Sequence, residues 1–91
     1  MKILWDEVKR RANMKKHGFD FADVIDFDWD RAIIENARPD LTGRRRLKAI
    51  GYFRDGIAAA IFSLLGTEAI SIISFRKANL KERRRLRWLK P

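Results

Sequence analysis

Two short segments, far apart in the chain, carry the side chains best suited to chemistry. Near the start, Lys16 and His17 lie side by side, and His17 is the only histidine in the sequence. Near the end, the segment 73–85 contains Arg76 and Glu82. An imidazole titrates near neutral pH, and cations can stabilise charge that develops on a phosphate. The combination indicates a metal-free site that acts on a polyanion, with RNA as the first candidate.

Cleavage of RNA without a metal needs a base for the ribose 2′-hydroxyl, an acid for the leaving 5′-oxygen and cations around the phosphate. His17 suits either proton-transfer role. Lys16 should lower its pKa, whereas the end of a helix should raise it, and the sequence leaves the balance open. A lone histidine more often has a structural role at a helix end, and Lys16 alone reads as a solvated lysine.

Arg76 and Glu82 also allow two interpretations each. Arg76 could grip a phosphate bidentately or pair with Glu82. By two-residue alternation along a strand, Arg76 should share a face with Ile70, Ile72 and Ser74. Glu82 could share the acid–base work with His17, or it could close a helix capping box with Asn79.

Further phosphate contacts are expected from basic residues elsewhere, namely Arg46, Arg54, Lys77 and Arg83. Runs of arginine such as 44–46 and 83–85 are often only solvated surface, and one of them could instead receive an acidic segment of a protein partner. Tyr52 and Trp88 are modest candidates for stacking on bases.

Composition narrows the class of protein. The 91 residues contain 21 Lys and Arg against 12 Asp and Glu, a net charge of +9, and 46% are hydrophobic. A folded, basic domain with a nucleic acid or acidic protein as partner is therefore expected. The sequence has no cysteine and one histidine, so we expect no metal site and no cofactor. Charged residues follow Met1–Trp5 at once and the apolar runs are short, which predicts a soluble, cytoplasmic protein without a membrane span.

Cap and turn signals predict the elements that must position these side chains. We expect a strand at 2–5, a helix at 7–16 that Asp6 caps and Gly18 ends, and a second helix from Asp20 to about Phe27. Strands are expected at 32–35, 46–53, 57–65 and 68–75, with Asp55-Gly56 as a hairpin turn, and a helix at 80–89. This order predicts one α+β domain over 1–91, with an antiparallel sheet of about four strands, two N-terminal helices and one C-terminal helix.

Several motifs resemble those of a known family, in the same order and spacing over most of the chain. They are Trp5-Asp6-Glu7, Lys9, Asn13, Lys16-His17-Gly18, Phe21, Gly51 and Ile73-Ser74-x-Arg76-x-Ala78-x-x-x-Glu82-Arg83. Together they resemble the BrnT family of toxins from type II toxin–antitoxin systems. The chain departs from the family pattern at Phe75, where relatives usually have Ala, and at Leu86 to Trp88, where relatives tend to carry a Tyr.

The resemblance implies a fold similar to that of RelE ribonucleases and an RNA-cleaving activity that arrests translation and growth. It also implies a BrnA-like antitoxin as partner, and contact with operator DNA only through the toxin–antitoxin complex. Lys16, His17, Arg76 and Glu82 would then be the catalytic residues. The alternative is a basic module without catalysis that binds nucleic acid or the antitoxin.

Overall fold

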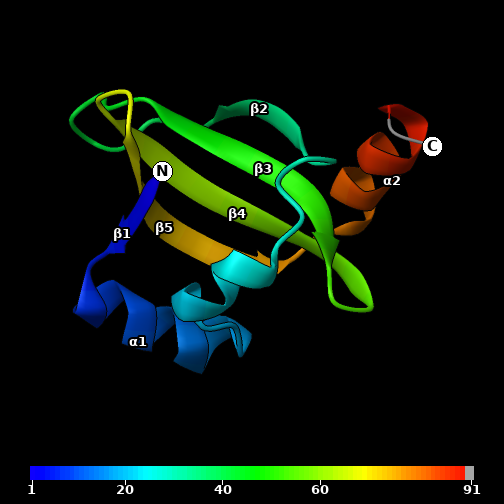
Figure 1. Ribbon diagram of the computed structural model, residues 1–91, viewed down its shortest axis with the longest axis horizontal. Helices are drawn as coiled ribbons and strands as arrows, with labels where there is room; N and C mark the ends of the chain where they lie inside the picture. Colours follow the sequence, from blue (N-terminus) through cyan, green and yellow to red (C-terminus); the bar gives the residue numbers. More distant parts are fainter. Residues whose placement is uncertain (90–91) are drawn as a thin grey trace.

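The computed structural model describes residues 1–89, which form an α+β fold around one twisted sheet (Figure 1). The strands are β1 (Lys2–Trp5), β2 (Ile33–Ala37), β3 (Arg46–Phe53), β4 (Gly56–Leu65) and β5 (Ala69–Lys77). The helices are α1 (Glu7–His17), the 3₁₀ helix η1 (Phe21–Asp26) and α2 (Leu80–Leu89). The predicted single domain of 1–91 includes Lys90 and Pro91, which lie outside the described residues, and it stays a prediction.

The sheet has five strands in the order β1-β5-β4-β3-β2 and is mixed. β2, β3, β4 and β5 pair antiparallel, as expected, but β1 adds to the edge of β5 in parallel, with Ile3 opposite Ile70. The expectation of about four purely antiparallel strands was therefore wrong. The pairing of the first strand with the last depends on a contact between distant segments, which no local pattern encodes.

Side-chain caps fix the ends of the two N-terminal helices where the sequence predicted them. The carboxylate of Asp6 accepts from the Val8 N–H at 2.9 Å, and Gly18 ends α1 with a φ of 73°. Asp20 caps the next segment by accepting from the Ala22 N–H at 2.9 Å. That segment is a 3₁₀ helix of six residues and not the α-helix expected from Asp20 to about Phe27.

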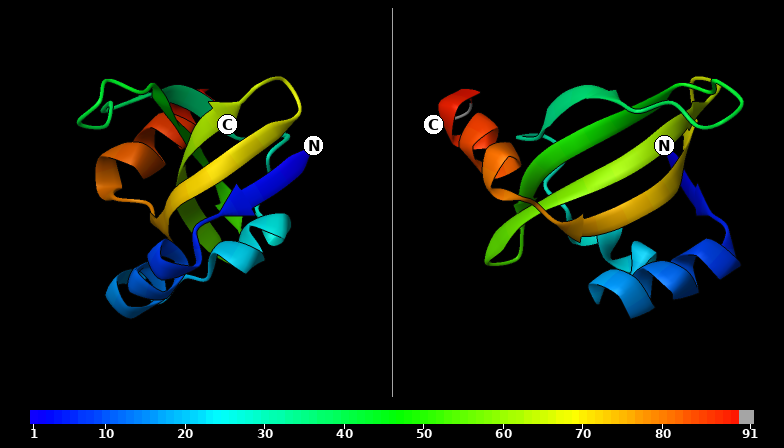
Figure 2. Two further views of the ribbon diagram at one scale, coloured as in Figure 1. Left: turned by 90° about the vertical axis from the view of Figure 1, so that its left-hand side faces the viewer. Right: turned by 180° about the vertical axis from the view of Figure 1, so that it is seen from behind.

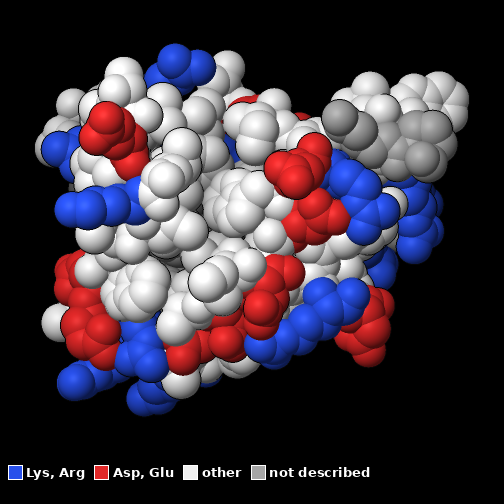
Figure 3. All heavy atoms as spheres, in the orientation of Figure 1, with Lys and Arg blue, Asp and Glu red and all other residues white. Residues whose placement is uncertain are grey.

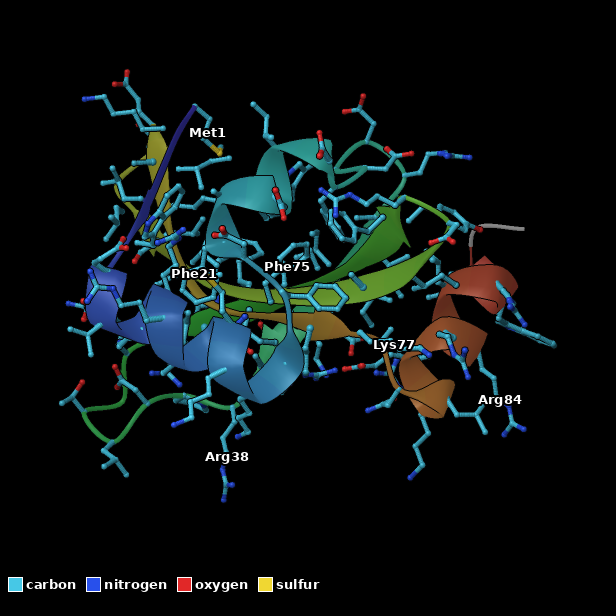
Figure 4. All side chains as sticks on the ribbon, turned by 90° about the horizontal axis from the view of Figure 1, so that it is seen from below. Met1, Phe21, Arg38, Phe75, Lys77 and Arg84 are labelled. Carbon is cyan, nitrogen blue, oxygen red and sulfur yellow. The ribbon has the colours of Figure 1, made fainter. Side chains whose placement is uncertain are left out.

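The helices cover both faces of the sheet (Figure 2). On one face, η1 and the end of α1 enclose an aromatic core in which Phe75 makes edge contacts with Phe19, Phe27 and Phe53. Phe21 and Phe75 are fully buried there, and Figure 4 labels both. On the other face, Leu86 of α2 packs on Ile33 and Ile50. The sheet is thus a rigid platform, with α1 and α2 on opposite faces.

An irregularity in β5 corrects the predicted face of Arg76. Ser74 pairs with Ile61, but the next residue of β4, Phe62, pairs with Ile72. Ile73 is thus an extra residue, and such a bulge reverses the alternation beyond it. Arg76 and Ser74 therefore lie on the face that α2 covers, opposite to Ile70 and Ile72, and the prediction that all four share a face was wrong.

The predicted hairpin between β3 and β4 is present, but its turn lies one residue earlier than expected. Phe53 pairs with Gly56, so the turn residues are Arg54 and Asp55 and not Asp55 and Gly56. Arg54 has a φ of 54°, in the left-handed region that a side chain with a Cβ adopts at a cost. Within residues 1–89, no helix is long and apolar enough to cross a membrane.

Candidate active site

The candidate site begins with the contact between α1 and the end of β5. Asn13 is buried, and its side-chain amide donates to the Phe75 carbonyl at 2.7 Å and accepts from the Phe75 N–H at 3.2 Å. The same amide donates to the Phe19 carbonyl at 2.9 Å. β1 pairs only with residues 69–72, so at Phe75, Asn13 takes the place of a strand partner. His17 follows Asn13 by one helical turn and Arg76 follows Phe75, so this contact places both predicted site residues near the open edge of β5, with Arg76 projecting on the face that α2 covers.

His17 is half-buried at the end of α1, and its surroundings favour the neutral imidazole. Burial lowers the pKa of His17 from its usual 6.5, and the positive charges of Lys16 and Arg76 lower it further. The sequence left open whether the pKa of His17 is raised or lowered, and in the structure it is lowered. Lys16 and Arg76 therefore both lie near enough to His17 to disfavour the imidazolium. A histidine that is neutral near pH 7 can accept a proton.

Glu82 lies at the centre of an ionic network and is almost fully buried, at 1% exposure. One carboxylate oxygen accepts from Arg76 at 2.7 Å and from the Asn79 N–H at 2.9 Å. The other accepts from Arg76 at 2.9 Å and from Lys48 at 2.8 Å. Asn79 in turn accepts from the Glu82 N–H at 2.8 Å, which completes the predicted capping box. Both oxygens are therefore fully engaged.

These contacts decide the protonation of Glu82. Burial raises its pKa, but the hydrogen bonds from Arg76 and Lys48 and from the Asn79 backbone outweigh burial and lower the pKa to about 2. Glu82 in return raises the pKa of Arg76. A carboxylate held in this way is unsuited to exchanging protons near neutral pH. The geometry favours Glu82 as the residue that orients Arg76.

Lys48 and Asn13 both hold parts of the candidate site in place, a role that the sequence did not predict for either residue. Lys48 bonds Glu82 and lies 3.7 Å from Glu35, which itself forms a 2.7 Å ion pair with Arg85 of α2. The network thus ties α2 to β2, β3 and β5. The sequence does contain a signal for Lys48, because this lysine lies within the largely apolar strand β3. A charge at an inward position needs a partner.

A groove of about 500 Å³ opens beside the end of α1 and collects three of the four predicted RNA-binding residues. Its basic lining residues are Arg54, Lys77 and Arg83, and its acidic ones are Asp23 and Asp55. Gly18, next to His17, lines the same groove. Figure 4 shows Lys77 between α1 and α2. In Figure 3, basic side chains gather around α2 and the β3–β4 turn, beside an acidic band over η1.

The structure does not bring Arg46 to this groove. Arg46 begins β3 whereas Arg54 follows its end, so the two are separated by roughly 26 Å of extended strand. Arg46 instead lines a different hollow, with Arg38 and Asp40. Its contact with RNA stays a prediction. Lys16 is exposed at the end of α1, and its charge contributes to the lowered pKa of His17.

At the two departures from the family pattern, Phe75 and Leu86 are core positions whereas Trp88 is exposed. Phe75 is fully buried in the aromatic cluster, and Leu86 is fully buried against Ile33 and Ile50. Trp88 is 86% exposed and does not line the groove beside α1. Within residues 1–89, no three His, Cys, Asp or Glu side chains converge in a way that could hold a metal ion.

Comparison with known proteins agrees with the motifs. The family model described as the ribonuclease toxin BrnT of type II toxin–antitoxin systems matches residues 5–82. The crystal structure of the Brucella abortus ribonuclease toxin BrnT superposes with a TM-score of 0.73 at 46% sequence identity, over 87% of this chain and 97% of that chain. A search of curated proteins found no significant match. With the match to the family model over most of its length, this chain belongs to the BrnT family of ribonuclease toxins of type II toxin–antitoxin systems.

Proposed function

We propose that this protein is a metal-independent endoribonuclease that cleaves RNA by transphosphorylation, with His17 as the general base. The observation that carries the proposal is the joint placement of His17 and Arg76. The imidazole has a lowered pKa and lies in the electrostatic field of a guanidinium that Glu82 holds in a fixed orientation. A basic groove begins at the neighbouring residue, Gly18.

In the proposed reaction, His17 removes the proton from a ribose 2′-hydroxyl, and the resulting oxygen attacks the adjacent phosphorus. The bond from phosphorus to the 5′-oxygen breaks, leaving a 2′,3′-cyclic phosphate, and the 5′-oxygen takes a proton from water. Arg76 and Lys16 neutralise the charge on the phosphoryl oxygens in the transition state. Glu82 acts through Arg76 and not on the substrate, because its two oxygens already accept four hydrogen bonds.

The test is cleavage of a mixed-sequence RNA by the purified protein, with and without EDTA. We expect cleavage that resists the chelator and products that end in a 2′,3′-cyclic phosphate. His17→Ala should lose at least a hundredfold in rate, within the range for a general base, and should no longer arrest growth on expression. Lys15→Ala, a matched change at the preceding exposed lysine of α1, should retain cleavage.

Arg76 needs a milder variant, because Arg76→Ala would leave the buried carboxylate of Glu82 without its main partner. Arg76→Gln removes the charge and keeps a donor for Glu82. We expect it to fold and to lose most of the activity, with folding checked by thermal unfolding. Full activity of the His17 or Arg76 variant would refute the site, and binding of RNA without cleavage by the wild type would favour the non-catalytic alternative.

The proposal also covers the partners of the protein and where it acts. Membership of a type II toxin–antitoxin family implies an antitoxin partner and an RNA target. We propose that a BrnA-like antitoxin neutralises the toxin in the cytoplasm, and that the operator is bound only through their complex. The expected similarity to RelE ribonucleases stays a prediction.

A further inference from the structure

The basic surface does not end at the groove beside His17. A second hollow, of about 340 Å³, lies against the other side of the β3–β4 turn and contacts α2. It shares Arg54, Asp55, Gly56, Ile57 and Arg83 with the first groove. The residues that it adds are Tyr52 and Arg87. Two hollows that share one rim make a continuous track around the turn.

The faces of the sheet explain why the track bends at this point. Phe53 lies on the α1 side of β3 and Tyr52 on the α2 side, because side chains alternate along a strand. The first groove is lined by Phe53 and the second by Tyr52. A strand of nucleic acid that leaves the first groove therefore crosses the turn at Arg54 before it reaches α2.

The charges along the track differ in how far acidic neighbours neutralise them. Arg54 lies 3.5 Å from Asp23 and 3.3 Å from Asp26, so part of its charge is compensated. Within residues 1–89, neither Arg83 nor Arg87 forms an ion pair. These two arginines are one helical turn apart on α2 and line the second hollow together. They present positive charges without a paired carboxylate on one side of the helix, although Asp55 lines the same hollow.

Arg83 also has a hydrogen-bond donor left unpaired within residues 1–89. Its Nε is buried and has no hydrogen-bond acceptor among the described residues. A buried donor without an acceptor is costly, and native structures rarely keep one without a reason. Arg83 lines both hollows, so an anion bound in either one lies beside this side chain. Arginine matches a phosphate particularly well, because its planar donors can bind two oxygens at once.

The aromatic ring beside these arginines points to a nucleotide. Tyr52 is half-buried, and the Arg31 guanidinium lies 4.7 Å from its ring centroid. Tyrosine rings and arginine planes are the surfaces on which unpaired RNA bases stack. An acidic peptide would use the arginines but would gain nothing from the ring.

We propose that the hollow bounded by Tyr52, Arg83 and Arg87 is a second RNA subsite, which binds a nucleotide next to the one cleaved at His17. The inference rests on the proposed function and deepens it, because it makes this toxin select single-stranded RNA long enough to cross the β3–β4 turn. Arg83 and Arg87 bind the phosphate of that nucleotide, and Tyr52 contacts its base.

The test compares a long and a short RNA that share one cleavage site, first mapped on mixed-sequence RNA. The short RNA has one nucleotide on each side of the scissile bond, and the long RNA has six nucleotides on each side. Arg87→Ala should lower kcat/KM on the long RNA by about tenfold, the loss of one charged phosphate contact, and the loss should shrink as the RNA is shortened. Arg84→Ala is the matched control, since it removes the same charge from the outer side of α2 (Figure 4).

Binding is measured in parallel with the long RNA carrying a 2′-deoxyribose at the scissile position. For Arg87→Ala the slope of log affinity against log salt should fall by about one, the value for one lost phosphate contact, and for Arg84→Ala by less. Tyr52→Leu should weaken binding of the long RNA without changing this slope. Equal losses for Arg87→Ala and Arg84→Ala, or equal losses on long and short RNA, would overturn the subsite. If the wild type binds unmodified RNA but cleaves none, the proposed function fails, while the salt dependence of binding for the variants still decides the subsite.

Discussion

Asn13 and Phe75, 62 positions apart in the sequence, are joined by a pair of hydrogen bonds that a strand would normally supply. The side-chain amide of Asn13 satisfies both backbone groups of Phe75 and also the Phe19 carbonyl. This one side chain therefore closes the open edge of β5 and fixes the end of α1 next to it. The positions of His17 and Arg76 relative to each other follow from that contact.

Replacing Asn13 tests this role. Asn13→Ala should lower the free energy of unfolding by about 2–3 kcal/mol, because it leaves buried backbone groups of Phe75 and Phe19 without partners. Urea denaturation measures the loss. Asn36→Ala, at an exposed asparagine of β2, should change the stability by less than about 0.5 kcal/mol. A small effect at Asn13 would mean that the aromatic core alone holds α1 in place.

The pKa of Glu82 predicts how stability depends on pH. The carboxyl has a pKa of about 2 in the folded protein, against an ordinary value of 4.5, so the folded state stabilises its ionised form. This contribution is complete above pH 4.5 and is lost as the pH falls from 4.5 towards 2. Its size is about 3 kcal/mol. Denaturation of the wild type and of Glu82→Gln between pH 2 and 7 should show a steeper acid loss in the wild type, and equal slopes would contradict the ion-pair assignment.

His17 gives a direct readout of the site, because a single histidine yields a single imidazole signal by NMR. Its pKa should lie below 6.5 in the wild type. Lys16→Ala and Arg76→Gln should each raise that pKa, since each removes a positive charge that disfavours the imidazolium. Lys15→Ala is the control and should shift it less. If Arg76→Gln leaves the titration unchanged, then the imidazole and the guanidinium do not share a site.

The pH dependence of cleavage follows from the same shift. A general base must be neutral, so kcat/KM should rise with pH through a midpoint below 6.5 and then level off. In Lys16→Ala this midpoint should move up together with the pKa from NMR. A midpoint that stayed fixed while the imidazole titration moved would assign the base to another group.

Arg54 has a strained backbone and also lies between the two hollows that we propose bind RNA. Arg54→Gly should raise the free energy of unfolding by roughly 0.5–1 kcal/mol, because glycine adopts a positive φ without a Cβ penalty. The same change should reduce cleavage of long RNA, since it removes a charge from the rim of both hollows. Thermal unfolding and cleavage assays measure the two effects. Arg38→Ala, an equal loss of charge on the loop after β2, should produce neither.

Local signals in the sequence were enough for most of the elements. Asp6, Gly18 and Asp20 cap helices where predicted, Asn79 and Glu82 form the capping box, and the helix at 80–89 has the predicted bounds. Each of these interactions joins residues within a few positions of one another. Backbone hydrogen bonding near a helix end depends on such neighbours, so the pattern of residue types determines it.

The motifs also determined the family, since their spacing identifies it without coordinates. They named His17, Lys16, Arg76 and Glu82 as a set, but not which of them exchanges protons. Whether Glu82 works as an acid depended on the cations that pair with it, which are Arg76 of β5 and also Lys48 of β3, 34 positions away.

Only the tertiary structure decided the features that join distant segments. The parallel pairing of β1 with β5, the Asn13–Phe75 contact and the place of Arg46 away from the groove all depend on how the sheet is assembled. The bulge at Ile73 moved Arg76 to the face opposite the one that alternation predicted. The physical reason is the same in each case: side-chain alternation and capping act over a few residues, whereas sheet register and burial are set by packing across the whole fold.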